Sequence, residues 1–78
     1  MQKKDNIKYA IQCKKYFNTV GNKSVQEVYA GKAFYNCHVG VVITNSTFTP
    51  GAISLAEATG ILLWDRETLK QMLAVLIE

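Results

Sequence analysis

The sequence predicts a small α/β domain in which strands and helices alternate in the order β-α-β-α-β-α. Its β-prone runs cover 8–14, 39–44 and 61–64, and apolar residues recur at helical spacing over about 24–36, from 50 to just before 60, and after 65. Such alternation is typical of parallel strands joined by right-handed crossovers. We therefore expect a three-layer architecture with helices packed over a three-stranded sheet.

Length and composition favour one globular domain and exclude several other classes. The chain has 78 residues, of which 49% are apolar and 19% are charged. No apolar run approaches the roughly 18–20 residues of a membrane helix, and no apolar stretch of a signal peptide follows the lysine-rich start. The two cysteines, Cys13 and Cys37, are too few for a disulfide scaffold. We expect a cytoplasmic protein without membrane contact.

The first strand has two different faces. Alternation along 8–14 puts Tyr9, Ile11 and Cys13 on one face, and Ala10, Gln12 and Lys14 on the other. We expect Cys13 to lie in the core and this strand to form an exposed edge of the sheet. The turn residues at 4–6 indicate the stub of a preceding strand at 1–3.

The other element ends follow from capping patterns. Ser24 and Glu27 form a capping-box pattern for the first helix. Thr49 is expected to cap the second helix, with Pro50 at its first position, and Asp65 to cap the third. The β-branched run at 39–44 predicts a strand that is covered on both faces.

Polar residues gather where the strands end, which is the edge at which open parallel sheets bind ligands. Gln12 and Lys14 lie near the end of the first strand and Lys15 follows it, and a hydroxyl-rich stretch at 44–47 follows the second strand. Two interpretations stay open for Gln12 and Lys14, namely a functional pair or the wet face of an edge strand.

The charge distribution also points to an anionic partner. Nine Lys and Arg residues against six Asp and Glu residues give a net charge of +3, and five of the lysines lie in the first fifteen residues. A basic patch of this kind suits nucleic acid, or it keeps a small apolar protein soluble.

Several motifs in order resemble one family of nucleases. They are Gln12 to Lys14, Val20 to Tyr29, Val41 to Thr49, and Ala56 to Asp65. Over about residues 7–75 the chain resembles the catalytic domain of Mrr-like restriction endonucleases, members of the PD-(D/E)xK superfamily in which Gln replaces the usual acid. The resemblance implies a restriction-endonuclease-like core.

The resemblance also implies Mg²⁺-dependent cleavage of the DNA backbone. Gln12 would help to hold Mg²⁺ or its bound water, and Lys14 would orient the attacking water and stabilise negative charge on the phosphate. The family match therefore makes DNA the expected partner. Its phosphates would be contacted by Lys15, Thr44, Asn45, Ser46 and Thr49.

One family motif has no match in this chain. The motif includes an Asp on the strand before the QxK strand, and that position falls before Met1. Asp5 lies in the turn, roughly 20 Å from Gln12 along an extended chain. We therefore expect residues 1–78 to form a single, N-terminally truncated nuclease domain with impaired catalysis.

Three hypotheses remain open from the sequence. In the first, the missing acid is supplied by Glu27, by Asp65 or by another chain, and Mg²⁺-dependent nicking survives. In the second, the domain binds DNA without cleaving it. In the third, it is an interaction module in which a partner or a swapped second copy of the chain replaces the absent strands. We expect a homodimer, because loss of the preceding strand and helix uncovers apolar sheet surface. Glu27 itself stays ambiguous between a site carboxylate and the capping partner of Ser24.

Overall fold

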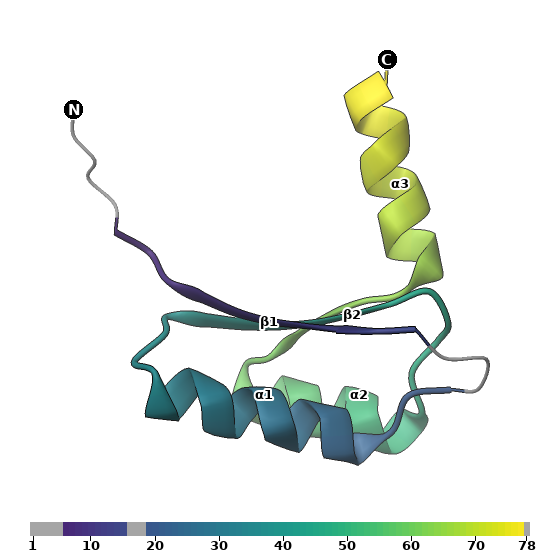
Figure 1. Cartoon of the computed structure of the whole chain (residues 1–78). Coiled ribbons are helices and arrows are strands. Elements are labelled where there is room, and N and C mark those ends of the chain that lie inside the picture. Colours follow the sequence, from purple (N-terminus) through teal and green to yellow (C-terminus); the bar gives the residue numbers. More distant parts are fainter. Residues whose placement is uncertain (1–5, 16–18, 78) are drawn as a thin grey trace.

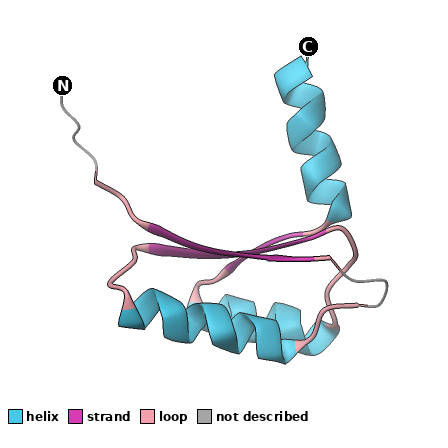
Figure 2. Cartoon of the chain, viewed as in Figure 1, coloured by secondary structure: helices cyan, strands magenta, loops and turns pink. Residues whose placement is uncertain are grey.

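The predicted order of elements is confirmed by the computed structural model, which describes residues 6–15 and 19–77. The strands are β1 (Tyr9–Lys14), β2 (Val39–Thr44) and β3 (Leu62–Trp64), and the helices are α1 (Asn22–Phe34), α2 (Pro50–Thr59) and α3 (Arg66–Ile77) (Figure 2). The fold is therefore α/β, in the arrangement of a restriction-endonuclease-like core. The predicted strand stub at 1–3 lies outside the described residues.

The sheet is parallel throughout and has the spatial order β1-β2-β3. Gln12 is in register with Val42, and Val42 with Leu63, so these three side chains share one face. Within the described residues, β1 pairs only with β2, which confirms that the first strand is an edge.

Helices α1 and α2 lie side by side under one face of the sheet (Figure 1). The buried residues of this core are small or β-branched, which lets the helices approach the strands closely. They are Val25, Val28, Val42, Ala52, Ala56 and Ile61. Gln12 and Lys14 project from β1 toward this helical layer.

The opposite face of the sheet is only partly covered. Helix α3 leaves the end of β3 and points away from the sheet (Figure 1). Tyr9 and Ile11 are each 56% exposed, and Leu62 is 46% exposed. Cys13 lies on this open face and is exposed, so the prediction that it is a core residue was wrong. The side chains of β1 alternate between the two faces as predicted, but the face covered by helices is the one that carries Gln12, not the one that carries Cys13.

Two of the predicted helix caps are confirmed in detail. Thr49 Oγ1 accepts the backbone N–H of Ala52 at 3.1 Å, and Gly60 ends α2 with a positive φ of 77°. Asp65 Oδ1 accepts the backbone N–H of Thr68 at 2.9 Å. No helix in the described part of the chain has the length and hydropathy to cross a bilayer.

The Asp65 cap makes a testable contribution to α3. The bond from the Thr68 N–H lowers the pKa of Asp65, so the ionised carboxylate stabilises the helix at neutral pH. We expect Asp65→Ala to cost about 1 kcal/mol of helix stability, seen as lost helical circular dichroism. Because the folded-state pKa is the lower one, the difference from wild type must disappear as the pH falls well below 3.8. A difference that persists in acid would contradict the role of the carboxylate.

Candidate active site

The candidate active site is built on the helix-facing side of β1. Gln12 and Lys14 are two residues apart on one strand, so they project in the same direction. Both are half-buried, and the Lys14 side chain keeps 21% of its exposure. Gln12 and Lys14 thus lie on the face of β1 that the helices cover, not on the face that is exposed to solvent.

Helix α1 starts earlier than its sequence pattern predicts. It begins at Asn22, its N-cap is Gly21, and no side chain caps it. Ser24 is buried inside the first turn, so the predicted capping box between Ser24 and Glu27 was wrong. Glu27 is left without a capping role and turns toward β1.

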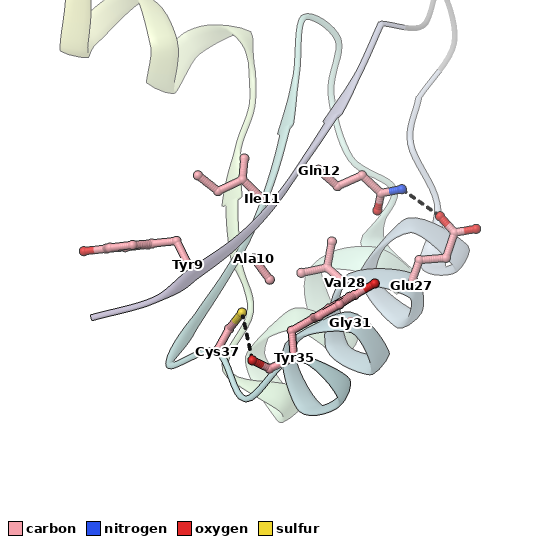
Figure 3. A pocket seen from close by; sticks show the side chains of 9 residues that line it. All are labelled: Tyr9, Ala10, Ile11, Gln12, Glu27, Val28, Gly31, Tyr35 and Cys37. Carbon is pink, nitrogen blue, oxygen red and sulfur yellow. Dashed lines mark hydrogen bonds between the residues drawn. The ribbon is translucent and has the colours of Figure 1, made fainter. Parts of the chain in front are cut away.

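Glu27 meets both polar residues of β1. Gln12 Nε2 donates a hydrogen bond to Glu27 Oε1 at 2.9 Å (Figure 3), and Lys14 Nζ lies 3.6 Å from the same oxygen. The bond from Gln12, followed by the charge of Lys14, lowers the pKa of Glu27. Glu27 is therefore ionised at neutral pH. The three predicted catalytic residues form one connected group.

The donor set of this group fits a hard cation such as Mg²⁺. Gln12 Oε1 is buried and has no hydrogen-bond partner, and Glu27 supplies an ionised carboxylate beside it. Mg²⁺ prefers oxygen ligands of these two kinds. Residues 6–15 and 19–77 contain no cluster of three or more His, Cys, Asp or Glu side chains that could hold a metal ion. This group therefore has a single carboxylate, whereas a strong Mg²⁺ site has more than one.

The residues predicted to contact DNA lie at the ends of β1 and β2. Lys14 is in register with Thr44, and a shallow depression of about 300 Å³ brings Lys14, Lys15 and Asn45 together, with Leu69 of α3 at its margin. Lys15 and Asn45 are exposed, and Ser46 is half-buried. This edge presents a positive charge and an amide side by side.

Two hydroxyls of the predicted DNA-binding set are used within the protein. Thr44 is 1% exposed, and its Oγ1 accepts the Ser46 backbone N–H at 3.1 Å. Thr49 is the cap of α2. Fully buried Val20 donates to Thr47 O at 2.8 Å and accepts from the Thr49 N–H at 3.0 Å. These bonds hold the loop that follows β2 against the segment before α1.

The sequence did not indicate a groove of about 420 Å³ between β1 and α1 (Figure 3). Gln12 and Glu27 line part of it, and the other lining residues include Tyr9, Tyr35 and Cys37. Gly31 is the signal that was overlooked. A Cβ atom at that position would meet nothing within 4 Å, so there is open space beside this glycine of the groove.

His38 and Asp65 lie apart from this group, and both are engaged elsewhere in the fold. The Lys8 backbone N–H donates to His38 Nδ1 at 2.9 Å, at the opposite end of the sheet from Lys14. Asp65 Oδ1 is occupied by the backbone N–H and the hydroxyl of Thr68. Neither residue supplies a free carboxylate or imidazole beside Gln12.

Comparison with known proteins gives one match. The model of the Mrr_cat family, described as restriction endonuclease, matches residues 1–73 of the chain. No curated protein and no solved structure matches. The matched segment contains all of β1, α1, β2, α2 and β3, together with the Gln12, Lys14 and Glu27 group. The chain therefore belongs to the Mrr_cat family of restriction endonuclease domains.

Proposed function

We propose that this nuclease-type domain hydrolyses the phosphodiester backbone of DNA with the help of Mg²⁺. The observation that carries the proposal is the connected group formed by Gln12 and Lys14 of β1, the outermost strand of the described sheet, with Glu27 of α1. It combines an orphaned amide oxygen, an ionised carboxylate and an ammonium group, as metal-assisted phosphoryl chemistry requires.

Each residue has a role that its chemistry supports. Gln12 Oε1 would hold Mg²⁺, which when bound supplies a Lewis acid and an activated water, and the ionised Glu27 carboxylate would add negative charge beside it. Lys14 binds a non-bridging phosphate oxygen through its ammonium group. Its positive charge becomes more favourable as negative charge develops on the phosphate, so it stabilises the transition state.

Lys15, Asn45 and Ser46 are the proposed contacts to the DNA backbone. Lys15 and Asn45 line the same depression as Lys14, and Ser46 follows Asn45 in the loop after β2. Thr44 and Thr49 support these contacts by shaping the loop between them. A DNA substrate and two free cysteines, Cys13 and Cys37, fit a cytoplasmic location.

The single carboxylate supports a second candidate, a domain that binds DNA without cutting it. Because Glu27 is the only acid of the Gln12 group in the described chain, we expect weak Mg²⁺ affinity and slow cleavage. The basic edge around Lys15 does not depend on the metal and would still bind phosphates.

One experiment separates these two candidates. Labelled duplex DNA is incubated with the chain in Mg²⁺ or in EDTA, and both cleavage and binding are followed over a salt series. Cleavage only in Mg²⁺ supports the nuclease. Binding that weakens steeply with salt, without cleavage in either condition, supports the second candidate. Absence of both would contradict a DNA function.

We also propose a homodimer in which α3 of each chain covers the open sheet face of its partner. Leu69 of α3 is half-buried, and Met72 and Leu73 are 40% and 56% exposed, so this side of the helix lacks a complete partner. The open face carries exposed Tyr9 and Ile11. A strand of six residues is roughly 20 Å long and a helix of twelve is roughly 18 Å, so the two surfaces match in length.

Both surfaces belong to one chain, so a two-fold axis would satisfy both at once. We expect sedimentation velocity to give a dimer for the wild type and a monomer for Leu73→Lys and for Ile11→Lys, one variant on each surface. Gln71→Lys adds the same charge at an exposed position on the side of the helix opposite Leu69 and Leu73, and it is expected to stay dimeric. A monomeric wild type at tens of micromolar, roughly the range of a specific weak dimer, would overturn the proposal.

A further inference from the structure

The amide of Gln12 has two chemically different ends, and the fold treats them differently. Its nitrogen donates to Glu27 Oε1 at 2.9 Å, while its oxygen is buried without a protein partner (Figure 3). A buried polar atom without a partner is costly and usually marks a functional requirement. Gln12 alone does not decide which end faces the helix, because its amide group can turn by half a rotation.

Glu27 decides the orientation. An ionised carboxylate only accepts hydrogen bonds, so the NH₂ group must face it. The reversed amide would set one oxygen against another and lose a charge-assisted hydrogen bond. The partner comes from α1, fifteen positions away in the sequence. The oxygen of Gln12 is therefore turned away from Glu27 by a contact between elements, not by β1 itself.

We infer that Glu27 is a positioning residue that presents Gln12 Oε1 as a ligand oxygen and anchors Lys14 beside it. The inference rests on the proposed metal-dependent function for the use of that oxygen. The same carboxylate oxygen lies within reach of both neighbours, 2.9 Å from Gln12 Nε2 and 3.6 Å from Lys14 Nζ. One side chain of α1 thereby fixes two side chains of β1 relative to each other.

The alternative is that Glu27 acts on the site through its negative charge alone. Two substitutions distinguish these roles because both remove the same charge. In Glu27→Gln, the new amide oxygen still accepts the bond from Gln12, whereas in Glu27→Ala that bond is lost. The difference between the two variants therefore isolates the hydrogen bond from the charge.

Mg²⁺ binding is measured by calorimetry on wild type and both variants, without DNA. We expect Glu27→Ala to bind Mg²⁺ at least tenfold more weakly than Glu27→Gln, the loss typical of a removed supporting contact. Equal affinities of the two variants would overturn the positioning role and leave Glu27 acting through its charge alone. Glu57→Gln and Glu57→Ala, the same changes at an exposed residue of α2, serve as matched controls and are expected to equal wild type.

A second measurement does not depend on the metal. In the ¹H–¹⁵N spectrum of the metal-free protein, we expect the Gln12 side-chain NH₂ protons to be shifted and slow to exchange. This signature should persist in Glu27→Gln and vanish in Glu27→Ala. If wild type binds no Mg²⁺, the proposed function fails while these resonances still test the orientation. Gln12 protons identical in all three proteins would overturn the inference.

Discussion

Lys14→Ala is expected to slow DNA cleavage at least about a hundredfold while leaving the fold intact. Lys14 Nζ lies 3.6 Å from Glu27 Oε1 in the proposed site, and its positive charge becomes more favourable as negative charge grows on the phosphate. Its ion pair with Glu27 is partly exposed, so its loss should cost little stability. The measurement is single-turnover cleavage of labelled duplex DNA in Mg²⁺.

DNA affinity provides the contrast for the same variant. Removing one phosphate contact should reduce the salt dependence of binding by about one unit of slope, a modest change beside the loss of rate. Lys70→Ala, which removes the same charge at an exposed position of α3, is the matched control and should cleave like wild type. A Lys14→Ala variant with unchanged cleavage would remove Lys14 from the mechanism.

Gly40→Val is expected to destabilise the domain by about 3 kcal/mol or more. Gly40 is buried in β2, and a Cβ atom there would lie 2.7 Å from Ile61 Cδ1 and 2.9 Å from Val28 Cγ1. The tip of Ile61 can turn aside, but Val28 is stiff at χ1 and sits in the core between α1 and the sheet. Gly40→Ala, with a single added carbon, should cost about 1 kcal/mol.

Gly31 supplies the control for this effect. A Cβ atom at Gly31 meets nothing within 4 Å, and the residue lies inside α1. Gly31→Ala should therefore stabilise the protein, by up to about 1 kcal/mol, through helix propensity. Urea denaturation of the three variants and wild type measures both effects. A Gly40→Val protein as stable as wild type would contradict the close packing of β2 against α1.

The elements and three of the helix ends were predictable because they depend on local patterns. Thr49 before Pro50, Gly60 after α2 and Asp65 before α3 each act within one turn of the chain. Ser24 and Glu27 formed an equally good local pattern, yet α1 starts two residues earlier than predicted and Ser24 is buried in its first turn. A local pattern could not reveal this packing effect.

The arrangement of the site depends on contacts between different helices and strands, which the spacing of residues along the sequence does not reveal. Alternation along β1 separated Gln12 from Cys13, but it could not say which face the helices cover, because that follows from the course of α1 and α2. The link from Glu27 to Gln12 and Lys14 joins different elements and emerges only after the crossover is folded. The groove beside Gly31 was missed for the same reason.

Nicking of supercoiled plasmid DNA tests most directly whether Gln12, Glu27 and Lys14 form a metal-dependent nuclease site. Wild type and Lys14→Ala are compared at equal concentration, each in Mg²⁺ and in EDTA. We predict open-circle DNA from wild type in Mg²⁺ and none from the other three reactions. Equal nicking by the two proteins, or nicking by wild type in EDTA, would contradict this assignment. Absence of nicking with DNA still bound at low salt would instead leave a domain that binds DNA without cutting it.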